Sequence, residues 1–243
     1  MSVWGKVIGG VAGFAIGGPF GALLGTLAGH TVDRARSQAG EADTTANRQV
    51  AFTMAVIVLG AKLAKADGRV TRDEVNAFKK IFHIPPQEMN VVGKLFNAAA
   101  KDVAGFESYA RQVAHMFTHE PAVLEELLAG LFHMAKIDGV VHTGELEYLR
   151  RVGAIFGFDA HAFERIRAQQ MGPEAADPYQ VLRLTRDATD EEVKTAYHKR
   201  SREYHPDTLI GQGLPQEFID LANEKMAAIN TAYDRIEKER GLV

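Results

Sequence analysis

His205, Pro206 and Asp207 are the residues best placed to act on another molecule, because they directly follow a helical, basic stretch. A proline cannot continue a helix, and its ring forces the preceding residue into extended geometry. The triplet therefore predicts a rigid corner that presents an imidazole and a carboxylate just beyond a helix end. The plain structural interpretation is a helix C-terminus with a proline stop, where basic residues complement the helix dipole.

The stretch before this corner carries two helical stripes. Its apolar stripe recurs at spacings of three, four and seven residues and consists of Val193, Ala196, Tyr197 and Tyr204. A basic stripe, with members four apart and one beside them, consists of Lys194, His198, Lys199 and Arg202. Arg200 falls on the apolar stripe, where either its stem runs along the core edge with the head in water or the packing is looser.

The elements around the corner change its interpretation. Asp177 opens a short helix, and Thr189 with Glu192 forms a capping box that starts the basic helix. After the corner, one long apolar stripe consists of Phe218, Leu221, Ala222, Met226, Ile229, Tyr233 and Ile236. A short helix, a basic helix, an HPD corner and a long antiparallel helix together resemble the J domain of the DnaJ (Hsp40) co-chaperones, over residues 177–243.

This resemblance implies a role for both motifs. His205, Pro206 and Asp207 would form the loop that stimulates ATP hydrolysis by a DnaK-type Hsp70. The basic stripe would dock on the acidic surface of that chaperone. The chain itself would not be an enzyme, and it shows no nucleophile paired with a base. Thr208, where a basic residue is common in J domains, would weaken docking slightly.

The N-terminal stretch from Val7 to Gly29 contains no charged residue. About 22 helical residues span roughly 33 Å, close to the hydrocarbon thickness of a bilayer. Glycines recur every four residues along it, at Gly9, Gly13, Gly17, Gly21, Gly25 and Gly29. Such a bare ridge lets a second transmembrane helix approach closely, which predicts a homodimer.

Three alternatives compete with an uncleaved anchor. A buried soluble helix would be destabilised by so many glycines, and a phosphate-binding loop lacks its Gly-Lys-Ser/Thr ending. A cleaved signal peptide is the serious rival, but its basic region would hold only Lys6 and its cleavage site would be poor. Arg34 and Arg36 follow the span, which places the N-terminus outside and the bulk of the chain in the cytoplasm.

Residues 48–170 show helical periodicity throughout, and about seven helices are expected there. An internal duplication offset by 71 residues repeats an Asp-Gly turn followed by a glutamate. Its acidic positions, which could converge as hard oxygen ligands of a divalent cation, are Asp67, Glu74, Asp138 and Glu145. Turn and capping chemistry is the favoured interpretation. The duplicated pattern resembles the TerB-like (tellurite-resistance) helical domain, whose acidic positions are proposed metal contacts, so the cation hypothesis stays open.

The chain of 243 residues, 46% hydrophobic and with a net charge of −3, has room for a sizeable core and no basic excess that would indicate nucleic acid. It has no cysteine, which excludes disulfides and thiolate chemistry. We expect an all-α protein without a required cofactor. Its predicted parts are an anchor (1–30), a linker (31–47), a TerB-like domain (48–170), a linker (171–176) and a J domain (177–243).

That order resembles the DjlA-type family, the membrane-anchored DnaJ-like co-chaperones of Gram-negative bacteria. The similarity is closest at WGKVIGG near the start and at HPDTLIGQGLP near the end. It implies a single-pass protein of the bacterial inner membrane that recruits Hsp70 there. The alternative function is a self-associating membrane sensor or scaffold, whose helical domain binds a metal or a protein.

Overall fold

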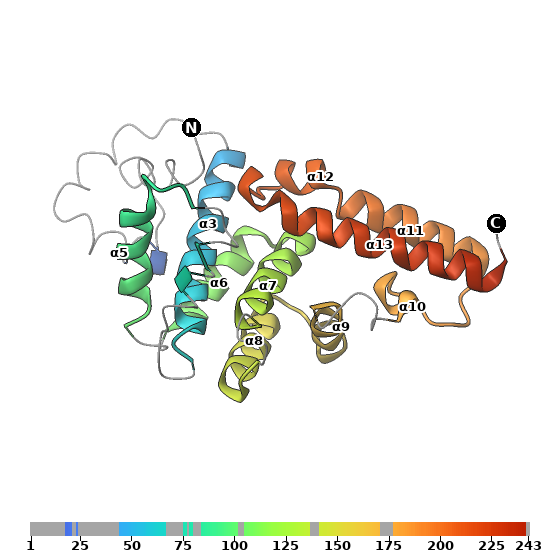
Figure 1. The fold of residues 1–243 in the computed structure, drawn as a ribbon, viewed down its shortest axis with the longest axis horizontal. Helices are drawn as coiled ribbons and strands as arrows, with labels where there is room; N and C mark the ends of the chain where they lie inside the picture. Colours follow the sequence, from blue (N-terminus) through green and yellow to red (C-terminus); the bar gives the residue numbers. More distant parts are fainter. Residues whose placement is uncertain are drawn as a thin grey trace.

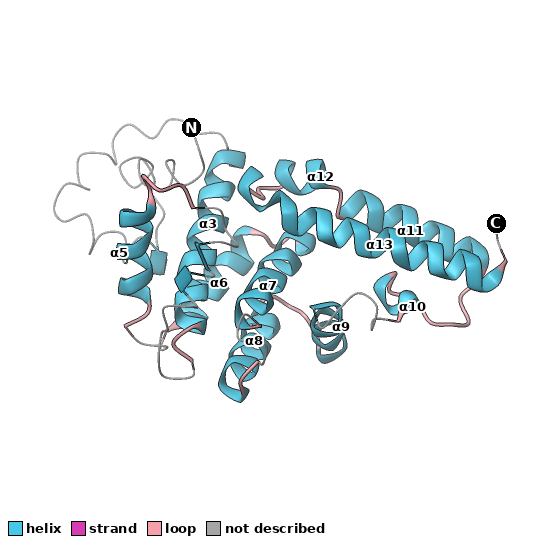
Figure 2. Cartoon of the chain, in the orientation of Figure 1, coloured by secondary structure: helices cyan, strands magenta, loops and turns pink. Residues whose placement is uncertain are grey.

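The computed structural model describes residues 18–20, 23, 44–66, 75–76, 78–79, 84–101, 105–136, 141–170 and 177–241. Every regular element within these ranges is a helix and none is a strand, which confirms the predicted all-α class (Figure 2). The helices form a bundle between Thr44 and Gln170, followed by a long hairpin that projects from it toward the C-terminus (Figure 1).

Helix α3 (Thr44–Leu63) is the centre of the bundle. Every residue from Val50 to Ala64 is buried, as expected for a helix that is apolar nearly all round. It contacts α5 (Met89–Ala99), α6 (Phe106–Met116) and α7 (Pro121–Ala135). The helix begins inside the stretch that we expected to be a linker, because Thr44 to Asn47 already adopt helical geometry.

Helix α7 is the second buried helix of the bundle, and every residue from Ala122 to Phe132 is buried. It packs against α8 (Thr143–Ile155) and α9 (Ala160–Gln170). Its sequence is apolar except for His133, which is exposed, and Glu125 and Glu126, both of which are buried. Two carboxylates inside a core require either partners or a proton.

The C-terminal unit begins with α10 (Pro178–Val181), capped by the Asp177 side chain as expected. Helix α11 (Asp190–Glu203) starts at the predicted capping box, in which the Thr189 hydroxyl accepts from the Glu192 N–H and the Glu192 carboxylate accepts from the Thr189 N–H. It runs beside α13 (Ile219–Arg240), and both contact one another along their apolar stripes (Figure 1).

The connection between α11 and α13 holds two short helices that the sequence did not lead us to expect. They are α12 (Pro206–Gly211) and a 3₁₀ turn, η2 (Gln216–Phe218). Pro206 ends α11 and also occupies the first turn of α12, where its missing N–H costs nothing. Gly213 follows with φ of 113°, and a Cβ there would lie 2.6 Å from the Cβ of Arg48 in α3. The backbone of this connection therefore lies directly on the bundle.

Candidate functional site

The corner predicted from the sequence is present at the end of α11. The helix ends at Glu203, and His205 is extended with φ of −61° and ψ of 132°. His205 caps α12, since its Nδ1 accepts a hydrogen bond of 3.2 Å from the N–H of Asp207. An Nδ1 that accepts this bond carries no proton, so in the neutral imidazole Nε2 is the donor. The side chains of His205 and Asp207 are 53% and 87% exposed, which leaves both available to a partner.

The basic stripe lies on α11, the helix that the corner ends. All four of its members are exposed, namely Lys194, His198, Lys199 and Arg202. None of them pairs with an acidic residue anywhere in the described part of the chain. Other arginines of the same unit are neutralised locally, for example Arg186 by Asp177 and Glu239. Lys194, Lys199 and Arg202 thus carry uncompensated positive charge along α11.

Arg200 packs along the core edge, as in the first expected alternative, but its head is not in water. Its side chain is only 11% exposed, and its guanidinium bonds Glu203 at 2.5 Å. Burial and the nearby Arg183 lower its pKa from the usual value. The stem thus fills part of the apolar stripe while the head stays paired at the edge, so the helix keeps its packing.

A buried ion cluster joins this unit to the bundle directly behind the corner. Its centre is Glu125 of α7, which is fully buried. The carboxylate accepts two hydrogen bonds from Arg165 of α9, at 2.9 and 3.1 Å. It accepts three more from the C-terminal unit: from Lys225 at 2.7 Å, from Arg183 at 2.6 Å and from the Tyr204 hydroxyl at 2.8 Å.

The electrostatics of the cluster follow from its composition. Burial alone would raise the pKa of Glu125, but Lys225, Arg165 and Arg183 outweigh it and hold the pKa well below the ordinary value. Burial and the negative Glu125 raise the pKa of Tyr204 well above its ordinary value, so its hydroxyl stays a donor. Arg183 has φ of 60°, an unusual conformation for a residue with a Cβ, and its side chain also bonds Tyr204 at 2.5 Å.

Sequence reasoning missed this cluster. Its partners lie between 40 and 100 residues from Glu125 along the chain. The available signal was the pair Glu125–Glu126 inside an apolar stretch of the helix, which requires buried partners that the sequence alone does not name.

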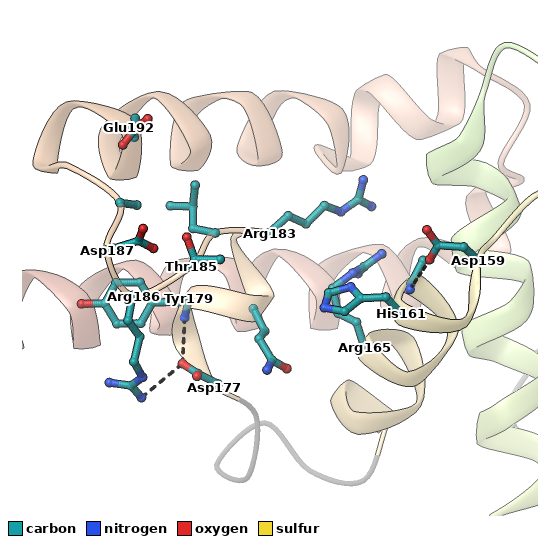
Figure 3. A pocket seen from close by; sticks show the side chains of 14 residues that line it. Asp159, His161, Arg165, Asp177, Tyr179, Arg183, Thr185, Arg186, Asp187 and Glu192 are labelled. Atoms are coloured by element: carbon teal, nitrogen blue, oxygen red, sulfur yellow. Dashed lines mark hydrogen bonds and ion pairs between the residues drawn. The ribbon is translucent and has the colours of Figure 1, made fainter.

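Two hollows flank the cluster. On one side a groove of about 840 Å³ opens between the start of α9 and the α10–α11 connection, with Arg165 and Arg183 on opposite walls (Figure 3). Its rim carries charges of both signs, including Asp159, Asp177 and Arg186. On the other side, a cavity of about 340 Å³ lies between α7, α9 and α13. The Glu125 cluster therefore lies between two hollows.

The acidic positions of the internal duplication fall mostly outside the described residues: Asp67, Glu74 and Asp138. Glu145 is described, and its carboxylate accepts the N–H of His142 at 2.9 Å in a capping box at the start of α8. That is the turn chemistry favoured from the sequence. Within the ranges described above, no three acidic or histidine side chains gather as a metal site. The divalent-cation hypothesis stays a prediction.

The glycine ridge lies outside the described residues at all six positions: Gly9, Gly13, Gly17, Gly21, Gly25 and Gly29. Of the helices that the structure does describe, none is both long and apolar enough to span a bilayer.

Comparison with known families matches the chain in three consecutive pieces. Residues 177–240 match the DnaJ domain, residues 53–168 match the tellurite resistance protein TerB, and residues 1–39 match the transmembrane domain of the co-chaperone DjlA. A co-chaperone protein DjlA of Photobacterium profundum is 32% identical over 98% of this chain and 99% of its own length. The chain belongs to the DjlA co-chaperone family.

Other members show the same full-length correspondence. The DjlA of Coxiella burnetii is 32% identical over the whole of both chains, and that of Salmonella paratyphi A is 29% identical over 99% of both. No solved structure matches this chain. The predicted resemblance to DjlA-type proteins is thereby confirmed. The transmembrane match assigns the N-terminal region to the family's membrane anchor, and the J domain makes the chain a co-chaperone, which regulates rather than catalyses.

Proposed function

We propose that this protein is a membrane-anchored co-chaperone whose J domain stimulates ATP hydrolysis by a DnaK-type Hsp70 and recruits that chaperone to the bacterial inner membrane. The observation that supports this most directly is the exposed, uncompensated basic stripe beside an exposed His205 and Asp207. The anchor spans the membrane once, with a short periplasmic N-terminus and a cytoplasmic bulk. Its glycine ridge pairs two chains.

The mechanism divides between the two parts of the site. The basic stripe steers an acidic partner surface toward α11, which raises the rate of encounter and is weakened by salt. The corner then supplies register, because His205 is already fixed as the cap of α12 and loses little freedom on binding. Stimulation requires that these contacts be stronger in the hydrolysis-competent state of Hsp70 than in its resting state.

A charge reversal on the stripe tests this division. We expect Arg202→Glu to weaken binding of ATP-loaded Hsp70 about tenfold at low salt and to flatten its salt dependence. The measurement is flotation of Hsp70 with vesicles of bacterial phospholipid carrying the full-length chain. Lys238→Glu is the matched control, since Lys238 is equally exposed but lies on α13 away from the stripe. Equal losses in both variants would contradict docking through the stripe.

A further inference from the structure

The HPD segment is attached to the helical domain on both sides. Before the corner, the hydroxyl of Tyr204, which directly precedes His205, donates to Glu125 of α7. After α12, Gly213 lies against Arg48 and Phe117, and the ring of Phe218 packs edge-on against Phe52 of α3 at 5.1 Å. Residues 205–212 thus form a short segment between two J-domain residues, Tyr204 and Gly213, that both contact the helical domain.

Glu125 is the shared partner of three J-domain elements. Arg183 follows α10, Tyr204 caps α11, and Lys225 lies in α13. Each donates to the same carboxylate, whose remaining bonds come from Arg165 within the helical domain. Moving the J domain as a whole would break all three bonds together and leave a carboxylate buried among unpaired cations.

The Glu125 cluster lies between the two hollows described above. The 840 Å³ groove opens between α9 and the α10–α11 connection on one side, as Figure 3 shows, and the 340 Å³ cavity lies between α7, α9 and α13 on the other. Between these hollows, the bonds to Glu125 act together with the Phe218–Phe52 contact to hold the J domain at one angle. His205, Asp207 and the basic stripe remain exposed in this orientation.

We propose that Glu125 is a positioning residue for Hsp70: by anchoring Tyr204 and the J domain to helix α7, it fixes the direction in which His205 and Asp207 are presented. This rests on the proposed function, since it assumes that Hsp70 is the partner of the corner. The basic stripe sets the affinity for Hsp70, and Glu125 sets the maximal rate of ATP hydrolysis once Hsp70 is bound. The J domain therefore acts on Hsp70 while it is held in one orientation relative to the helical domain.

The test compares Glu125→Gln with wild type in the full-length chain in detergent, using two readouts. The first is single-turnover ATP hydrolysis at increasing concentrations of the co-chaperone, which separates the half-saturating concentration from the maximal rate. We expect the maximal stimulated rate to fall about tenfold, because the corner is misdirected after docking. The half-saturating concentration stays within about twofold of wild type, because the stripe is untouched.

The second readout is the spacing of the domains. The chain has no cysteine, so spin labels can be placed at Glu147→Cys in α8 and Asp234→Cys in α13, both exposed sites. Dilution with unlabelled protein restricts the measurement to distances within one chain. Wild type gives a narrow distance distribution and Glu125→Gln a broad one. Glu164→Gln, which removes an exposed carboxylate paired with Arg150 and Arg167, is the matched control and behaves as wild type.

A milder variant tests the anchoring of the corner separately from the orientation of the whole J domain. Tyr204→Phe keeps the buried ring but removes the hydroxyl donor, so the distance distribution stays narrow while the maximal rate falls about threefold. If Glu125→Gln fails to fold, the maximal rate of Tyr204→Phe still tests whether the bond to Glu125 positions the corner.

Three results would overturn the proposal: an unchanged distance distribution in Glu125→Gln, a broadened one with an unchanged maximal rate, or a wild-type rate in Tyr204→Phe. If the folded wild type does not stimulate Hsp70 at all, the proposed function fails instead, and the distances still decide whether Glu125 orients the J domain.

Discussion

Phe218→Ala is expected to lower the free energy of unfolding of the full-length chain by about 3–5 kcal/mol. The side chain is 2% exposed, and its ring meets Phe52 of the helical domain at 5.1 Å and an interplanar angle of 79°. Truncation removes this edge-to-face contact and leaves a cavity where two domains meet, which neither domain can close without moving the other.

Urea unfolding in detergent, followed by far-ultraviolet circular dichroism, measures the effect. Val91→Ala is the control, because Val91 is 39% exposed and its loss is expected to change stability by no more than about 0.5 kcal/mol. A change below about 1 kcal/mol in Phe218→Ala would show that the ring is not buried between the domains.

Glu126→Gln is expected to change how stability depends on pH. Burial raises the pKa of Glu126 from 4.5 to about 8; Lys225 opposes this, and Glu125 and Glu224 add to it. Its Oε1 finds no hydrogen-bond partner among the described residues. Between pH 4.5 and 8 the folded chain therefore holds a proton that the unfolded chain has lost. Stability from this group is fully present below pH 4.5 and declines as the pH rises toward 8.

The glutamine variant has no such proton to lose. Its stability relative to wild type should therefore grow by about 3 kcal/mol between pH 5 and pH 8, measured by urea unfolding at each pH. Glu125 acts in the opposite sense and in a different window, because its lowered pKa contributes stability that is lost only below about pH 4.5. Parallel pH profiles for variant and wild type from pH 5 to 8 would mean that Glu126 is ionised in the folded protein.

The parts of the fold set by local chemistry were predictable from the sequence. Asp177, the Thr189–Glu192 capping box and the apolar stripes of α11 and α13 all lie where their spacing places them. For Pro206, the sequence predicts only one of its two structural roles. We treated it as the end of one helix, whereas the same residue begins α12, since a fixed φ and a missing N–H suit both positions.

The site divides in the same way. The exposure of His205, Asp207 and the basic stripe follows from helical spacing and was anticipated. The Glu125 cluster was not, because Arg165, Arg183, Tyr204 and Lys225 come together only when four helices and a turn are assembled. Each of these residues looks ordinary in its own segment. The only indication is that a carboxylate buried in α7 must be paired, so cations from distant segments must lie next to it.

The most direct test is single-turnover ATP hydrolysis by a DnaK-type Hsp70, with full-length wild type and His205→Gln compared side by side. His205 is exposed and contributes only a cap to the six-residue helix α12, so the variant should fold. We expect wild type to accelerate hydrolysis and His205→Gln to leave the rate at that of Hsp70 alone. Acceleration that survives in the variant, or none from folded wild type, would contradict a J-domain co-chaperone that acts through this corner.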